Sequence, residues 1–596
     1  MFAWTERELN EEQGAAVVQP GSVFLVACPG SGKTRTLTYK IARELSLLTS
    51  SRQYVVAITY TNRAADEIVA RIEALGVDTR QLWIGTIHAF CLEWVLKPYS
   101  IYLPRLARGF TVIDPYDRQQ LLERLCAAHE RPRITHYDCD YFVTSTGTEL
   151  CCRENAKRVA IRAVLRQYFQ ALRDSQQIDF EMILGFADRL LRAHPAISRT
   201  LSHVFSMILV DEYQDTKQVQ YEIIGSILRA GSGRCRLFMV GDPNQAIYGS
   251  LGGYAIAIED LRALTGIPIA QSALSRNYRS SRRIIEYFEH FNLHSTQIEA
   301  FGRDREFESR ITYNAEVTRA DLVVEIGRLV RHAVHDLAVP QREVCVLAPQ
   351  WVHLAALTRR LVTEVPEIEF DGPGMAPFSR NIENFWYTVA CLALTEPSPS
   401  MYLRRVRWAT KFLSALNDAG VALNHVDQKA VLKHCNSIRL LQRDGLDYLR
   451  AFFDSLFERM GVDFHVYLQL LSDHDAFFSS SHAQVERLEG EGVRDSRDLT
   501  FFKRVFAPRS GITVSTIHGV KGGEFDVVIA CGLLEGMVPH FSDPEGESAG
   551  RKLLYVTASR ARKHLHLISE KGRRRGNFGD YSATEVLERY RFNYNN

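Results

Sequence analysis

A glycine-rich loop between a strand-like run and a helix-like run constrains the fold of this chain more than any other feature. Ser22 to Val26 (SVFLV) is short and apolar, and Thr34 to Leu47 has the pattern of a helix. The loop between them reads Ala27-Cys28-Pro29-Gly30-Ser31-Gly32-Lys33-Thr34. A loop of this kind in a strand–loop–helix setting predicts a phosphate-binding P-loop and a parallel α/β domain around it.

Each residue type in the loop has a physical role in binding a phosphate. Gly30 and Gly32 allow the backbone to curl until successive N–H groups face a phosphate, and the start of the helix adds about half a positive charge. Lys33 supplies a mobile cation, and Thr34 carries a hydroxyl that can be a ligand of Mg²⁺. We therefore expect a nucleoside triphosphate and Mg²⁺ at this loop.

A second motif, Asp211-Glu212-Tyr213-Gln214-Asp215, completes this chemistry. The apolar residues Met207 to Val210 (MILV) precede it, so the acids leave the end of a buried strand. In such a site the first acid, Asp211, holds the metal ion, and the second, Glu212, accepts a proton from the attacking water. The two motifs together predict an enzyme that hydrolyses a nucleotide.

The composition is that of an ordinary globular protein with several domains. The chain has 596 residues, whereas a single hydrophobic core seldom grows beyond about 250 to 300 residues. Hydrophobic residues make up 46% and charged residues 24%, which excludes disorder as the default. The net charge is only +2, so a surface for nucleic acid would have to come from local patches of basic residues.

The sequence gives no sign of export, membrane insertion or a zinc site. The segment Met1 to Gln13 is rich in glutamate, unlike a signal peptide, and no apolar run approaches the roughly eighteen residues of a membrane span. We therefore expect a cytoplasmic protein. The 11 cysteines lack C-x-x-C pairs, although Cys139, Cys151 and Cys152 form a loose cluster with His136. Reduced thiols are favoured there over a metal.

Short β-rich runs separated by helical stretches predict two parallel sheets. The first series precedes and follows a stretch between Phe90 and His203 whose pattern is helical, and the second is interrupted by a helical stretch from Pro397 to about Arg504. The predicted strands of the first series are 25–27, 54–59, 82–86, 207–210 and 237–240. Those of the second are 344–348, 512–515, 527–530 and 564–568.

Further motifs resemble, in order along the whole chain, those of superfamily 1 DNA helicases of the UvrD/Rep type. They are Leu9-Asn10-x-x-Gln13, Thr59 to Ala65, Gly85 to His88, Val240 to Tyr248, Asn277 to Ser280, Thr516 to Phe525 and Tyr555 to Ala561.

The resemblance implies an α/β fold of two RecA-like parallel-sheet domains, each with a helical insertion. In the 1A/1B/2A/2B nomenclature, the first motor domain is 1–90 and 195–275, with insertion 91–194. The second is 276–395 and 505–596, with a reduced insertion 396–504.

The same resemblance implies roles for residues around ATP. Gln13 and Tyr278 would hold the adenine, Arg35 would lie near the nucleoside, and Glu524 would contact the ribose. Gln245 would sense the γ-phosphate. Arg279 and Arg560, both from the second sheet domain, would reach the γ-phosphate and spread the charge that develops during transfer.

A single DNA strand is the polymer that these motifs favour. Tyr60 and Tyr248 stand beside predicted strand ends, where bases could stack on them. Short polar side chains and one arginine in the same motifs offer hydrogen bonds to phosphate oxygens. These residues are Thr61, Asn62, Arg63, Thr86, His88, Thr516 and His518.

The sequence leads to three hypotheses about function, and it supports them unequally. The first is an ATP-dependent translocase on single-stranded DNA that separates tailed duplexes, 3′ to 5′ as in the resembled family. The second is a DNA-sensing ATPase subunit that regulates a partner nuclease of the OLD/TOPRIM type, as in Gabija-like antiviral defence systems. The motives for it are the reduced second insertion and Ser250-Leu251-Gly252-Gly253, which replaces the family's usual aromatic-Arg-Gly-Ala run. The third, a GTPase or metabolite kinase, is disfavoured because no guanine-reading loop is present.

Overall fold

The computed structural model describes most of the chain in two compact units. The larger comprises Met1–Val112, Leu122–Gln350 and Ser515–Asn596, and the smaller Ile113–Leu121 and Trp351–Val514. The described residues are 2, 4–129, 131–372, 376–379, 381, 384–398, 401–421, 423, 426–490, 495–506, 510–541, 543, 545–575 and 579–595, without the side chains of 63, 351–353 and 403.

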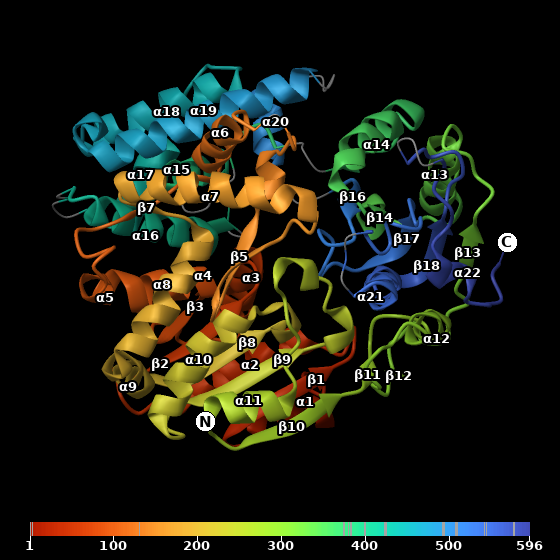
Figure 1. Cartoon of the computed structure of the whole chain (residues 1–596), viewed down its shortest axis with the longest axis horizontal. Coiled ribbons are helices and arrows are strands. Elements are labelled where there is room, and N and C mark those ends of the chain that lie inside the picture. The colour runs from red at the N-terminus through yellow and green to blue at the C-terminus, as the bar shows by residue number, and fades with distance from the viewer. Residues whose placement is uncertain are drawn as a thin grey trace. The chain divides into compact units, whose positions relative to one another are not determined.

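The first sheet of the larger unit has six strands in the order β10-β1-β9-β8-β2-β3, and its pairs are parallel (Figure 1). Both faces are buried, as expected for a parallel sheet. Along β8, Met207 packs on one side and Ile208 on the other. The strands are β1 (Ser22–Ala27), β2 (Tyr54–Thr59), β3 (Leu82–Thr86), β8 (Phe205–Asp211), β9 (Arg236–Gly241) and β10 (Ile269–Leu274).

Helices join these strands and bring the loops after β1, β8 and β9 to one edge of the sheet, because carboxyl ends of parallel strands meet there. Leu37 and Ile41 of α2 pack on one face, and Ile223 and Ile224 of α10 on the other. The helices are α1 (Glu11–Val18), α2 (Lys33–Ser46), α3 (Asn62–Ala74), α10 (Gln218–Gly231) and α11 (Ile258–Thr265).

The insertion between β3 and β8 is helical, as predicted, but it also contains a hairpin that the sequence analysis missed. Strand β5 (Tyr141–Thr144) pairs antiparallel with β6 (Gly147–Leu150). Each strand has only four residues, so their alternation is too short to stand out against the surrounding helices. The helices of this insertion within the larger unit include α4 (Ile87–Phe90), α7 (Asn155–Asp174), α8 (Phe180–Ala193) and α9 (Pro195–Val204).

A second parallel sheet forms the rest of the larger unit, where β13, β18, β17 and β14 lie side by side in that order. Its core includes Ile284 and Phe288 of α12 and Leu554 of α21. The predicted α/β fold with two RecA-like sheets is thereby confirmed. The elements are α12 (Arg282–Glu289), β13 (Ile311–Asn314), α13 (Leu322–Arg331), β14 (Val344–Ala348), β17 (Phe525–Ala530), α21 (Glu547–Ala558) and β18 (Ala561–Ile568).

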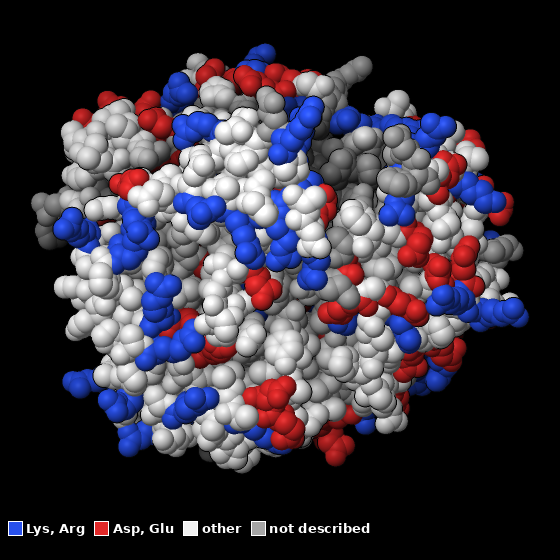
Figure 2. Space-filling view, in the orientation of Figure 1, with Lys and Arg blue, Asp and Glu red and all other residues white. Residues whose placement is uncertain are grey.

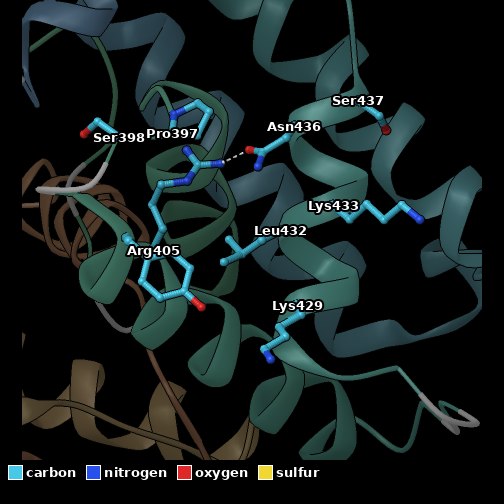
Figure 3. Close-up of a pocket in the computed structure, with 9 residues that line it drawn as sticks. Pro397, Ser398, Arg405, Lys429, Leu432, Lys433, Asn436 and Ser437 are labelled. Carbon is cyan, nitrogen blue, oxygen red and sulfur yellow. Dashed lines mark hydrogen bonds between the residues drawn. The ribbon is translucent and has the colours of Figure 1, made fainter.

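The smaller unit is mostly helical and packs around Trp386, which is fully buried. The buried Arg405 of α16 donates from one guanidinium nitrogen to Asn436 Oδ1 of α17 at 2.8 Å, beside a pocket with Lys429 and Lys433 at its edge (Figure 3). This bond ties the two helices together. The helices include α15 (Phe385–Ala393), α16 (Tyr402–Asp418), α17 (Gln428–Ser437), α18 (Gly445–Met460), α19 (Leu468–Gly490) and α20 (Leu499–Arg504).

Two expectations about composition can be compared with the described residues. No helix among them is long and apolar enough to cross a bilayer. No group of three or more His, Cys, Asp and Glu side chains in the described ranges is placed to hold a metal ion. Cys139 instead lies with its Sγ 3.6 Å from that of Cys126, and all cysteines are free thiols.

Candidate functional site

The loop after β1 is shaped for glycine at two positions. Gly30 has φ +68° and Gly32 has φ +82°, in the left-handed region that side chains rarely adopt. A Cβ at Gly30 would lie 2.6 Å from the Cβ of Arg279, and one at Gly32 would lie 2.5 Å from Gln13 Nε2. No side chain caps the start of α2 at Gly32, so its first N–H groups remain available to an anion.

The charges beside this loop fit a phosphate and a divalent cation. Within the described part of the chain, Lys33 makes no hydrogen bond and no ion pair. Asp211 ends β8; burial, reinforced by the charge of Glu212, raises the pKa of its carboxyl to about 7. Burial also acts to raise the pKa of Glu212, but Lys33 and Lys521 outweigh it, and its net pKa is lowered. Glu212 is thus a carboxylate able to accept a proton, and a cation near Asp211 would stabilise its ionised form.

The backbone of Glu212 is itself unusual. Its φ of +50° places a non-glycine residue in the left-handed region, an uncommon and strained conformation that is enriched at active sites. Its Oε2 accepts a hydrogen bond of 2.5 Å from Gln214 Nε2. The turn and this bond fix the direction of the carboxylate.

A chain of buried polar contacts runs from this carboxylate to an arginine of the second sheet. Gln214 Oε1 accepts from the N–H of Asp242 at 3.0 Å, and Asp242 Oδ2 accepts from Gln245 Nε2 at 2.7 Å. Gln245 Oε1 in turn accepts from Arg560 at 2.7 Å. Sequence analysis assigned no role to Gln214 or Asp242, although polar residues directly after buried strands were a signal for both.

The two arginines that the resemblance predicted both reach this region. Arg279 Nε donates to Glu524 Oε2 at 2.7 Å, and its Cβ lies against Gly30 as described above. Arg560 is 2% exposed, and burial, followed by the nearby charge of Arg279, lowers its pKa to about 9. Residues more than 200 positions from the P-loop in sequence, including Glu524, thus meet it in space.

The predicted adenine residues also lie at the loop. Gln13 is buried and donates from Nε2 to the carbonyl of Ser31 at 2.8 Å. The N–H of Tyr278 donates to the carbonyl of Gly30 at 2.9 Å, and its hydroxyl accepts from Asn10 Nδ2 at 2.6 Å. The ring of Tyr278 is 39% exposed, and Arg35 at the start of α2 is exposed. Both therefore remain accessible to a ligand.

Two of the predicted strand-binding residues form an aromatic pair. The ring centroids of Tyr60 and Tyr248 are 5.1 Å apart at an interplanar angle of 31°, and Tyr60 is 47% exposed. His518 adjoins them, with its ring 5.4 Å from that of Tyr248. Its main-chain carbonyl accepts from the Tyr248 hydroxyl at 3.2 Å. Residues from both sheet regions thus build one aromatic surface.

The hydroxyls of the predicted strand-binding threonines are occupied by local backbone contacts. Thr61 accepts from the N–H of Ala64 at 3.2 Å, and Thr86 accepts from Ala89 at 3.3 Å, both as N-caps of helices. Thr516 accepts from the N–H of Gly519 at 2.8 Å. Each hydroxyl still has a proton to donate, so capping is compatible with a contact to phosphate.

The remaining three candidates lie close to Thr61 and Thr86. Asn62 begins α3. The side chain of Arg63 lies outside the described residues. His88 Nε2 is buried without a hydrogen-bond partner in the described chain. Burial, together with the charge of Lys217, lowers the pKa of His88 to about 4. A neutral imidazole with an unpaired nitrogen suits a ligand contact.

Comparison with known proteins identifies the family to which this chain belongs. The family model of the UvrD/REP helicase N-terminal domain matches residues 9–262, and that of the UvrD-like helicase C-terminal domain matches 502–572. The chain belongs to the UvrD/Rep helicase family.

Relatives match most of the chain at low identity. ATP-dependent DNA helicase UvrD1 of Mycobacterium leprae is 26% identical over 94% of this chain and 82% of its own length. ATP-dependent DNA helicase PcrA of Staphylococcus epidermidis is 24% identical over 94% of this chain and 83% of its own length. DNA helicase II of Escherichia coli is 32% identical, over 46% of this chain and 39% of its own length.

In this UvrD/Rep-type chain, a buried ion pair that sequence analysis did not single out links the nucleotide site to the aromatic pair. Lys521 Nζ donates to Asp215 Oδ1 at 2.7 Å and Oδ2 at 2.6 Å, and to the carbonyl of Gln245 at 2.8 Å. The same ammonium lies 5.5 Å from the centroid of the Tyr248 ring. A movement of Gln245 would therefore be transmitted to Tyr248 through the side chain of Lys521.

Proposed function

We propose that this UvrD/Rep family member is an ATP-dependent DNA helicase that moves 3′ to 5′ along single-stranded DNA and separates tailed duplexes. The observation that carries the proposal is the chain of contacts from Glu212 to Arg560, extended by Lys521 to Tyr248. It joins the groups suited to hydrolysis with those suited to stacking on bases.

The residues present fit ATP and Mg²⁺ in the following roles. The uncapped N–H groups of α2 and the free ammonium of Lys33 would hold the phosphates. Thr34 and Asp211 would bind the metal ion, which as a rule keeps several waters and uses only one or two carboxylates. When bound, Mg²⁺ neutralises charge on the phosphate oxygens. Glu212 would take the proton of the attacking water.

Arginines from the second sheet would complete this site. Arg279 and Arg560 would lie against the phosphoryl group in transfer, and arginines in this role contribute about 10³ to 10⁵ in rate. In the described structure they bond to Glu524 and Gln245, so ligand binding must exchange these partners. Gln245 would report the state of the γ-phosphate.

Hydrolysis would be coupled to movement because the two halves of the site belong to different sheets. Bound ATP interacts with Lys33 on one side and Arg560 on the other, which favours a closed arrangement of the two motor domains, and product release removes that preference. Tyr60, Tyr248 and His518 would hold and release bases in step, with the predicted polar contacts on phosphate oxygens. The division of the chain into domains 1A, 1B, 2A and 2B, with the bounds given above, is part of this proposal.

Steady-state ATP hydrolysis with and without single-stranded DNA tests the proposal, with Glu212→Gln as the blank. We expect strong stimulation by DNA, and displacement of a strand from duplexes with a 3′ tail but not a 5′ tail. No stimulation with a normal basal rate would contradict it. Stimulation without displacement on any tailed duplex would favour the alternative, a DNA-sensing ATPase that regulates a partner nuclease.

A further inference from the structure

A large groove opens in the insertion between β3 and β8, and none of the residues assigned above lines it. Its volume is about 1220 Å³, and its walls are the hairpin β5–β6, the end of α7 and one side of α8. Figure 2 shows basic side chains over the part of this face where Figure 1 places α7 and α8.

The groove is strongly positive although the chain is nearly neutral. Five arginines and one acid, Asp188, line it, so the lining carries 5 − 1 = +4 charges while the whole chain carries +2. Arg192 pairs with Asp188. Arg105 donates to the carbonyls of Leu172 and Gln177, each at 2.9 Å. The side chains of the remaining arginines have no hydrogen-bond partner among the described residues: Arg108, Arg173 and Arg189.

Aromatic and apolar side chains form part of the same lining. Phe169, Phe186 and Met182 are half-buried, and the Arg189 guanidinium lies 5.5 Å from the centroid of the Phe186 ring. Positive charge that follows a groove, together with rings on which bases can stack, is the combination that binds single-stranded nucleic acid. An acidic peptide would satisfy the arginines but would not use these rings.

The hairpin holds this groove beside the turn that carries Tyr248. Tyr141 and Val143 line the groove, and Phe142 points to the other side, where a Cβ at Gly252 would lie 2.8 Å from its ring. The N–H of Gly253 donates to the carbonyl of Tyr248 at 2.9 Å, which closes the turn.

A second contact fixes the hairpin from the side of α8. Glu181 accepts from the N–H of Val143 at 3.2 Å and forms an ion pair with Lys217. The backbone of Lys217 also forms an isolated antiparallel β-bridge with that of Gly253. The groove and the Tyr248 turn are therefore parts of one connected structure.

We propose that this groove binds the sugar-phosphate backbone of the single strand whose bases contact Tyr60 and Tyr248. The inference rests on the proposed function and adds a second binding surface to it. It also accounts for the Ser250–Gly253 run, which lacks an aromatic ring and an arginine. At this run, Gly252 leaves room for the ring of Phe142. Arginines of the insertion would replace the DNA contacts that the run itself does not make.

The test removes the three unpaired arginines together, as Arg108→Ala, Arg173→Ala and Arg189→Ala. Binding of a labelled oligo-dT is measured by anisotropy over a range of salt concentrations. Each lost phosphate contact lowers the salt slope by about 0.7 for a single strand, so we expect a loss of about 2 in slope and about 100-fold in affinity at 0.1 M salt. Replacing the same three residues by lysine should restore most of the slope.

The control removes three arginines of α7 that lie outside the groove: Arg158, Arg162 and Arg166. An equal loss in the control variant, or no loss in the groove variant, would overturn the inference. The ATPase rate without DNA and the rate at saturating DNA should match the wild type in both variants. A wild-type enzyme that DNA does not stimulate would instead refute the proposed function, so the two failures are distinguishable.

Discussion

The two parallel sheets of the larger unit share an architecture but differ in the charges at the nucleotide site. The first sheet supplies the glycine loop, Lys33 and the acids that follow β8 and β9. The second supplies no comparable loop after β14, where Pro349 and Gln350 follow the strand, but contributes the buried Arg560 before β18. A common fold therefore does not fix chemistry, which depends on a few residues at strand ends.

Under the proposed function, neither sheet would hydrolyse ATP alone. The proposed proton acceptor, Glu212, is connected to Arg560, the arginine that would stabilise the transferred group, through Gln214, Asp242 and Gln245. Substitutions on either side should therefore stop turnover, but they should leave different intermediates.

The largest effect is expected for Lys33→Ala on the first sheet. Because this ammonium makes no hydrogen bond and no ion pair in the described chain, its removal should cost phosphate binding and little stability. We expect no measurable turnover and at least about a 10-fold weaker binding of ATP, measured by titration with a fluorescent analogue. Lys571→Ala, on a surface lysine paired with Glu316, serves as the control. Tight nucleotide binding by the Lys33 variant would contradict the assignment.

Arg560→Ala should produce the corresponding defect on the second sheet. Turnover should fall by about 10³ to 10⁵, while binding of single-stranded DNA is retained. Because Arg560 is buried, Arg560→Lys is made alongside it, and the midpoint of thermal unfolding is recorded for both. If a folded variant kept its turnover, the second sheet would have no part in catalysis.

Glu212→Gln should separate binding from hydrolysis. The amide cannot accept the proton, so turnover should fall by about 10² to 10⁴ while ATP remains bound. The trapped complex should show slow exchange of bound nucleotide compared with the Lys33 variant. Wild-type turnover would require a different base.

Tyr60→Ala tests the strand-binding surface that the two sheets share. Loss of one stacking ring should weaken oligonucleotide binding by about 1 to 3 kcal/mol. The salt slope should not change, because stacking releases no counterions. Tyr137→Ala, at a ring that is 75% exposed, is the matched control. A reduced slope in the Tyr60 variant would indicate that this residue positions a cation.

The smallest expected effect is a loss of stability at acidic pH, which should differ between the two sheets. Burial lowers the pKa of His564 to about 4 and that of His566 to about 3, whereas the strands of the first sheet contain no histidine. Both imidazoles are neutral when folded and take up protons on unfolding below about pH 6.5.

Stability should therefore be unaffected above pH 6.5 and should fall toward pH 4, by at most about 1.4 kcal/mol per histidine per pH unit. Hydrogen exchange should show β18 losing protection between about pH 6.5 and pH 4 before β1 does. Equal losses in both strands would mean that other groups govern the acid response.

Local patterns in the sequence were sufficient for much of the fold and for the choice of candidate residues at the proposed nucleotide site. Apolar runs of strand length predicted β2 and β14 with their bounds, and β1 with a start three residues too late, because parallel strands buried on both faces are almost continuously apolar. The hairpin β5–β6 was missed because it is short and lies among helices.

The strand-binding candidates show where local patterns are insufficient. Thr61, Thr86 and Thr516 were chosen for hydroxyls that could reach a phosphate, and the structure uses each hydroxyl as an acceptor for a nearby N–H. A capping threonine and a phosphate-binding threonine look the same in sequence, because both need a short polar side chain at the start of a helix.

The sequence by itself determined the P-loop, the acids after β8 and the order of the family motifs, because each depends on neighbouring residues. Only the tertiary structure decided that Lys521 pairs with Asp215, that Phe142 packs against Gly252, and that arginines from separate segments line one groove. These contacts join residues that are far apart along the chain. Their geometry depends on how the sheets and the insertion pack, and no local pattern records it.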